Sequence, residues 1–122
     1  MQVSKQKMGI YKATAKRRWK REQLQLSLSY SQKWVLAKKA AELLKEKFGA
    51  QRVIVFGSIT QKELYHLNSD LDIAVWGLDE KEFHRAVAKL LELDPAQRVD
   101  LVRIENARDS LRSVIEQEGV LI

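Results

Sequence analysis

The stretch from Arg52 to Gly77 constrains this chain most, because it contains two short apolar runs that each end at a glycine. The first run, residues 53–56, is β-branched and aromatic, which predicts a strand buried on both faces. The second run, residues 71–76, predicts another strand, and an Asp-Leu-Asp step opens it. Polar chemistry is therefore concentrated where one buried strand ends and the next begins.

Three aspartates are associated with the predicted strands. Asp70 and Asp72 are two residues apart, so strand alternation should place both carboxylates on one face with Cα atoms about 7 Å apart. Asp100 lies in a third apolar run, residues 98–102, on the face opposite its two apolar neighbours. Like charges repel unless a cation lies between them, and hard oxygen ligands suit Mg2+. These three aspartates therefore predict a magnesium site.

A Gly-Ser step follows the first strand and has the chemistry of a phosphate site. Gly57 allows close approach because it lacks a Cβ atom, and Ser58 adds a hydroxyl to the backbone N–H groups. We expect a short helix over residues 58–63 with its first turn facing the phosphates. Lys62 lies one turn into this helix and would reach them.

Turn chemistry offers a plainer explanation of the same residues. The Asp-Leu-Asp step follows Asn68 and Ser69, which favour turns, and Gly57 could merely end a strand. That interpretation leaves Asp72 and Asp100 unexplained, because each lies within an apolar run, where an unpaired carboxylate costs several kcal/mol.

The pattern resembles the nucleotidyltransferases of the DNA polymerase beta superfamily, whose signature is Gly-Ser, a spacer, Asp-x-Asp and a third acidic residue on a later strand. In this chain the signature is Gly57-Ser58, Asp70-Leu71-Asp72 and Asp100. The resemblance implies a small α/β nucleotidyltransferase core over residues 31–122, with a mixed β-sheet flanked by helices. Residues 1–30 are then a basic N-terminal helical extension.

Within that superfamily the chain is most similar to the minimal nucleotidyltransferases, which commonly act as antitoxins beside a helical HEPN-domain ribonuclease toxin. The resemblance implies Mg-dependent transfer of AMP from ATP to a tyrosine of the toxin. It implies catalysis and metal binding by Asp70, Asp72 and Asp100, with nucleotide binding by Gly57 and Ser58. The family often has arginine directly after the serine, where this chain has Ile59, and Lys62 would substitute for it in binding the nucleotide. A core without an acceptor-binding domain must receive its acceptor from another molecule.

Charge divides the chain into two parts. Residues 1–52 carry 14 Lys and Arg against 3 Asp and Glu, whereas residues 53–122 carry 8 against 13. Residues 1–21 contain eight basic side chains, no acidic ones, and Trp19. This extension either contacts nucleic acid or an acidic protein, or it is a solvated helix that packs only when a partner is present.

The remaining helices follow from apolar periodicity. Residues 31–48 predict a helix that ends before Gly49, and Asp79 with Glu82 predicts a capping box for the next helix. We expect inward-facing side chains in that helix and in a last helix over residues 110–118, followed by an extended tail over 120–122. The inward residues are predicted to be Phe83, Val87, Leu90, Leu91, Leu111, Val114 and Ile115.

The composition points to an intracellular protein. Cysteine is absent, which suits a reducing cytoplasm and excludes a disulfide framework. No apolar run approaches the length of a membrane span. Two other functions remain open: a non-catalytic antitoxin that neutralises a partner by contact, and a nucleotidyltransferase that modifies a small molecule or RNA.

Overall fold

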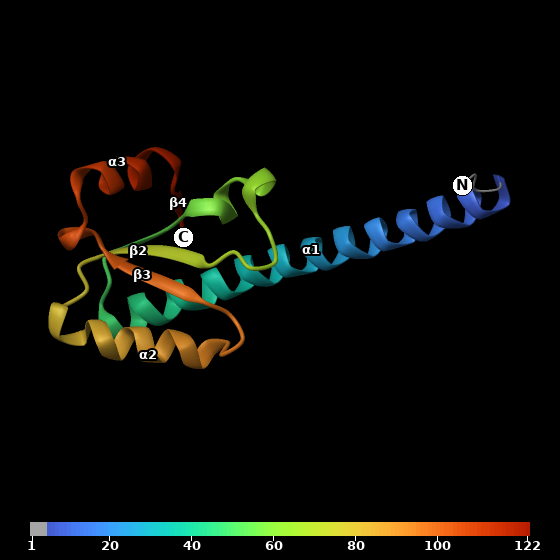
Figure 1. The fold of residues 1–122 in the computed structure, drawn as a ribbon. Coiled ribbons are helices and arrows are strands. Elements are labelled where there is room, and N and C mark those ends of the chain that lie inside the picture. Colours follow the sequence, from blue (N-terminus) through green and yellow to red (C-terminus); the bar gives the residue numbers. More distant parts are fainter. Residues whose placement is uncertain (1–4) are drawn as a thin grey trace.

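A computed structural model describes residues 5–122 as a four-stranded sheet with helices on both faces. Figure 1 shows α2 and the C-terminal half of α1 against one face of the sheet and α3 against the other. The helices and strands are α1 (Lys5–Phe48), β1 (Arg52–Phe56), β2 (Leu71–Trp76), α2 (Phe83–Leu93), β3 (Val99–Arg103), α3 (Asp109–Glu118) and β4 (Val120–Leu121).

The sheet is mixed, with the strand order β3-β2-β1-β4. β1 pairs antiparallel with β2 and β4, and β2 pairs parallel with β3. Consequently the C-terminal end of β1 and the N-terminal ends of β2 and β3 lie at the same edge of the sheet, with β2 between the other two. The expected small α/β core with a mixed sheet flanked by helices is confirmed, and the C-terminal tail is extended as predicted.

Alternation in β1 divides the apolar residues between two cores. Val53 and Val55 belong to the larger core, which includes buried residues of α1 and α2. Ile54 and Phe56 belong to the smaller core, together with Ile115 of α3. All four apolar residues of β1 are buried, so the prediction of a strand covered on both faces is confirmed.

The two predicted helical segments, the basic extension over residues 1–30 and the helix over residues 31–48, form one helix. The helical extension is confirmed from Lys5 onward, but a separate helix beginning at Ser31 is not, because α1 is continuous from Lys5 to Phe48. Residues 5–30 contain no proline and many strong helix formers, which allows the helix to continue. The boundary between residues 30 and 31 therefore falls inside one helix, and the division into two domains stays a prediction. Gly49, with φ of 67°, follows the helix in the left-handed conformation, as expected for a C′ residue.

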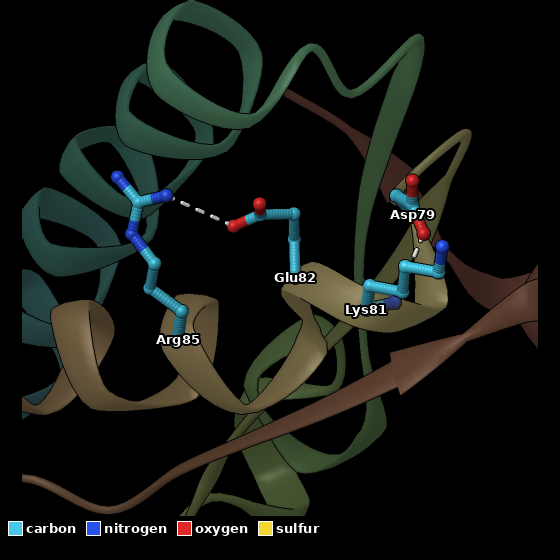
Figure 2. Close-up of polar contacts among 4 residues, drawn as sticks. All are labelled: Asp79, Lys81, Glu82 and Arg85. Carbon is cyan, nitrogen blue, oxygen red and sulfur yellow. Dashed lines mark hydrogen bonds and ion pairs between the residues drawn. The ribbon is translucent and has the colours of Figure 1, made fainter.

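The start of the second helical segment differs in detail from a capping box. A short 3-10 turn, Glu80–Glu82, precedes α2, and the Asp79 carboxylate accepts a hydrogen bond of 2.9 Å from the Lys81 backbone N–H. Figure 2 shows that Glu82 instead pairs with Arg85, at 3.1 Å. Asp79 is therefore the predicted N-cap, whereas Glu82 stabilises the following turn of helix.

Two of the predicted core positions are wrong. Leu91 is 45% exposed and Val114 is 43% exposed. Leu91 follows the fully buried Leu90, and Val114 precedes the fully buried Ile115. One position is about 100° around a helix, so each exposed side chain points away from the side that its neighbour buries. Both helices bury a narrower stripe than the apolar pattern indicated.

Within residues 5–122, no helix combines the length and the apolar character needed to cross a membrane.

Candidate active site

The strand register brings two of the predicted aspartates together. Asp72 of β2 is directly opposite Phe56 at the end of β1 and directly opposite Asp100 at the start of β3. Asp72 alternates with Leu71 and Ile73, which belong to the larger core, so its carboxylate faces the α3 side of the sheet. The same side receives Asp100, because parallel partners in register share a face. This register agrees with the prediction that the carboxylates of Asp72 and Asp100 lie close together.

Gly57 lies against the carboxylate of Asp72. Its φ is 81°, and a Cβ atom added there would overlap Oδ2 of Asp72 and lie 3.2 Å from Cγ. Any L-residue would meet both the backbone strain of a positive φ and this collision. Glycine is thus required for two independent reasons, and its second role is to leave room for a carboxylate.

The environment of Asp72 disfavours its charged form. Burial, followed by the charges of Asp100 and Asp70, raises the pKa of Asp72 from 3.8 to about 6. The side chain is half-buried at the end of a sheet, where neighbouring carboxylates are poorly screened. A cation bound here would relieve the repulsion and restore the ionised form.

Asp70 lies one residue before β2 and is held differently. Its Oδ1 atom is 3.5 Å from Nε of Arg98 in an ion pair, and the two side chains are 38% and 85% exposed. Such exposed pairs contribute at most about 1 kcal/mol, so Arg98 leaves this carboxylate available. The backbone N–H of Leu71 donates to the Arg98 carbonyl at 2.9 Å, which fixes the entry of β2 against the entry of β3.

A lysine of α1 is buried near the same carboxylate. Lys33 is only 2% exposed and its Nζ donates to Oε1 of Gln97. Burial lowers the pKa of Lys33, against the opposing attraction of Asp70 and Asp94. Neither Lys33 nor Arg98 was predicted from the sequence to lie at the site. Lys33 could have been found, because it precedes the buried Ala37, Ala40 and Leu44 at helical spacing.

The burial expected for Asp100 from its apolar neighbours is not observed. Asp100 is exposed, so the cost of burying an unpaired carboxylate applies to Asp72 but not to Asp100. Among residues 5–122, no group of three His, Cys, Asp or Glu side chains is gathered closely enough to form a ready-made metal cage. The donor chemistry still fits Mg2+, which needs one or two carboxylates and takes its other ligands from water and phosphates.

The segment after Gly57 is not the single short helix expected over residues 58–63. It forms two 3-10 turns, Gly57–Thr60 and Lys62–Leu64. The Thr60 hydroxyl donates to the Gly57 carbonyl at 2.7 Å, and the Ser58 carbonyl accepts from Gln61 at 3.1 Å. These bonds give the Gly57-Ser58 step a fixed turn conformation at the end of β1.

Lys62 points toward α1. Its Nζ lies 5.7 Å from the centre of the Tyr30 ring, and the Tyr30 hydroxyl donates to the Ile59 carbonyl at 3.0 Å. A groove of about 460 Å3 lies here between α1 and the second turn, lined in part by Tyr30, Lys62 and Tyr65. Lys62 is exposed and attached to the turn that follows Ser58, so its role with a nucleotide stays a prediction.

The raised pKa of Asp72 has a consequence for stability. Because the folded protein binds this proton more tightly than the unfolded chain, ionising Asp72 destabilises the fold as pH rises from about 4 through about 6. Without metal at pH 7.5, Asp72→Asn should therefore raise the free energy of unfolding by about 1 kcal/mol, a value reduced for partial exposure. Urea unfolding at pH 7.5 and pH 4 measures this. The gain should vanish at pH 4, and an equal gain at both pH values would contradict the electrostatic cause.

Comparison with known proteins gives a consistent set of similarities. The sequence profile described as "Polymerase beta, Nucleotidyltransferase" matches residues 38–122. A solved toxin–antitoxin structure with AMP-PNP shares 30% sequence identity and a TM-score of 0.59, with 70% of each chain covered. A complex of tri-AMPylated Shewanella oneidensis HEPN toxin with MNT antitoxin shares 25% identity and a TM-score of 0.56, covering 73% of this chain and 70% of that one.

A third solved structure, of a candidate minimal nucleotidyltransferase, shares 27% identity and a TM-score of 0.57. The match covers 80% of this chain and 95% of that one. No curated protein sequence matches the chain. The residues matched by the family profile include the Gly57-Ser58 step and the three aspartates.

Proposed function

Because the chain belongs to the polymerase beta nucleotidyltransferase family, we propose that it transfers AMP from ATP to a tyrosine of a HEPN-domain toxin and acts as its antitoxin. The observation that carries this proposal is the contact of Gly57 with Asp72, which is itself in register with Asp100. Two similar structures support the choice of nucleotide and acceptor, one a toxin–antitoxin with AMP-PNP and the other a complex containing a tri-AMPylated HEPN toxin.

The turn after β1 would bind the phosphates of ATP. Gly57 allows a phosphate to approach the backbone closely, and Ser58 offers its N–H and hydroxyl. Lys62 is exposed on the next turn and would neutralise the β- and γ-phosphates. In this role Lys62 would leave the ring of Tyr30, which a long lysine side chain does easily.

Asp70, Asp72 and Asp100 would hold Mg2+ beside these phosphates. When bound, Mg2+ neutralises phosphate charge and lowers the pKa of a hydroxyl that coordinates it. In the reaction, the tyrosine oxygen forms a bond to the α-phosphorus, the bond to the bridging oxygen breaks, and pyrophosphate leaves. The exposed Asp100 carboxylate would accept the phenolic proton.

The position of the site suits a macromolecular acceptor. Asp100 is exposed at the start of β3, so a tyrosine on another protein can approach it without entering a deep pocket. Binding of the partner would then position the phenol against the nucleotide, and such positioning supplies a large part of the rate of a two-substrate reaction.

Intact-protein mass spectrometry of the cognate toxin tests the proposal. Incubation with this protein, ATP and Mg2+ should add AMP to the toxin, and fragmentation should place the AMP on a tyrosine. With α,β-methylene ATP, in which carbon replaces the bridging oxygen, no AMP should be added because that bond resists cleavage. Toxin that is fully inhibited without any added AMP would instead identify a binding antitoxin that acts by contact.

A further inference from the structure

The N-terminal half of α1 extends away from the rest of the protein (Figure 1). We refer to residues 5–25 of this helix as the arm. Every side chain from Tyr11 to Gln25 is exposed, and burial begins only at Leu26. At 1.5 Å per residue the arm is about 30 Å long, comparable to the width of a small domain. The family profile begins at residue 38, so the arm is an addition to the matched core.

The arm is strongly basic on several sides. It carries eight Lys and Arg residues and one acidic residue, Glu22. Arg17, Arg18 and Lys20 point in three different directions, because each residue along the chain advances about 100° around the helix. A helix with positive charge on several sides attracts an extended polyanion.

Two aromatic side chains are exposed within this positive region. Tyr11 is 66% exposed and Trp19 is 59% exposed. Trp19 precedes the fully buried Ala37 by 18 residues, or five helical turns, so it lies on the side of α1 that packs against the core farther along. Lys12, Lys16 and Trp19 share this side of the helix at spacings of three and four residues.

This side of the arm leads to the candidate active site. Gln23 continues the line from Trp19 and lines the groove of about 460 Å3 beside Tyr30 and Lys62. The groove adjoins the turns that follow Gly57. A neutral stretch, Gln23, Leu26 and Ser27, joins the basic and aromatic side of the arm to this groove, whose far wall carries Lys62 and Glu63.

We propose that the arm binds single-stranded nucleic acid, with phosphates along its basic side chains and a base stacked on Trp19. Proteins that bind single strands combine positive charge, which contacts the phosphates, with exposed aromatic side chains, on which any base can stack. This binding goes beyond the transfer of AMP, uses none of the three aspartates, and stands or falls separately from it.

Other occupants fit the arm less well. A membrane surface needs one apolar face, but Leu24 and Leu28 lie five and nine residues after Trp19, on the far side of the helix from it. A second copy of the arm would bring two sets of eight positive charges together, which opposes pairing of the helices. A polyanion of regular phosphate spacing satisfies the charge without an apolar interface.

Fluorescence anisotropy of a labelled 20-nucleotide oligouridylate, titrated with the full chain at several salt concentrations, tests the proposal. Replacing Lys16, Arg17 and Arg18 together by alanine should weaken binding at least about tenfold and lower the salt slope by about 2, since each lost phosphate contact contributes about 0.7. The matched control replaces Lys38, Lys39 and Lys47, three exposed lysines on the same helix outside the arm, and should change little. Circular dichroism verifies that both variants keep their helix.

Stacking is tested by Trp19→Ala against Trp19→Phe. Alanine should weaken oligouridylate binding about tenfold, because it removes the stacking of a base on an aromatic ring, whereas phenylalanine should retain most of the affinity. Equal losses in the arm variant and its control would overturn the proposal. So would binding of polyglutamate or anionic vesicles as tight as that of the oligonucleotide, or an unchanged affinity for Trp19→Ala.

Discussion

Asp72→Asn should reduce the rate of AMP transfer at least about a thousandfold, because the asparagine amide cannot supply the charge that holds a divalent cation at the phosphates. Loss of several kcal/mol of transition-state stabilisation corresponds to a rate change of this size. Asp72 is the central carboxylate of the site, in register with Asp100 and adjacent to Gly57. The initial rate of labelled AMP incorporation into the toxin measures the effect.

Asp79→Asn is the matched control for this substitution. Asp79 is exposed and caps the turn before α2 through a hydrogen bond to the Lys81 backbone N–H, and asparagine caps almost equally well. The rate should therefore be unchanged. An Asp72→Asn variant that still transfers AMP at more than a tenth of the wild-type rate would show that Asp72 is not part of the reaction.

The two effects expected of Asp72→Asn have opposite signs. The substitution should stabilise the metal-free fold and remove activity, because the pKa of Asp72 is raised by burial and by two like charges. If the Asp72 carboxylate served only to stabilise the fold, neutralising it would lower the free energy of unfolding of the protein. Gain of stability with loss of function is the pattern expected of a site whose strain is relieved by its ligand.

Much of the site followed from strand periodicity. Asp72 and Asp100 were assigned to strands by their apolar neighbours, and the observed register places them opposite each other. The surroundings of Asp70 were less predictable, because it lies just outside β2 and its partner Arg98 lies just outside β3. Local patterns do not encode such contacts between loops, which depend on the parallel pairing of two strands far apart in the sequence.

The continuity of α1 across residues 30 and 31 was not predicted, for a different reason. Helix periodicity was sought through buried apolar residues, and residues 11–25 bury none. A helix exposed on all sides has no apolar stripe and is maintained by residue propensity and by its continuity with the packed half. The buried Lys33 was not predicted because the search for a buried stripe considered apolar residues alone.

Gly57→Ala should abolish AMP transfer, whereas Gly49→Ala should leave it intact. Both glycines have positive φ values, 81° and 67°, so alanine meets similar backbone strain of about 1–2 kcal/mol at either position. A Cβ at Gly49 meets nothing within 4 Å, but a Cβ at Gly57 overlaps the Asp72 carboxylate. Comparing the two variants therefore separates backbone strain from displacement of the carboxylate.

The measurements are AMP incorporation and thermal unfolding of both variants. Gly57→Ala must push Asp72 out of its place, since Cγ and Cβ of Asp72 lie only 3.2 and 3.4 Å from the added atom and a short side chain cannot swing clear of them. We expect Gly57→Ala to lose more stability than Gly49→Ala, because the collision adds to the backbone strain, and we expect a loss of transfer in Gly57→Ala alone. Equal AMP transfer by both variants would mean that the reaction does not require the Asp72 carboxylate at the position next to Gly57. Asp72 would then not hold the cation there.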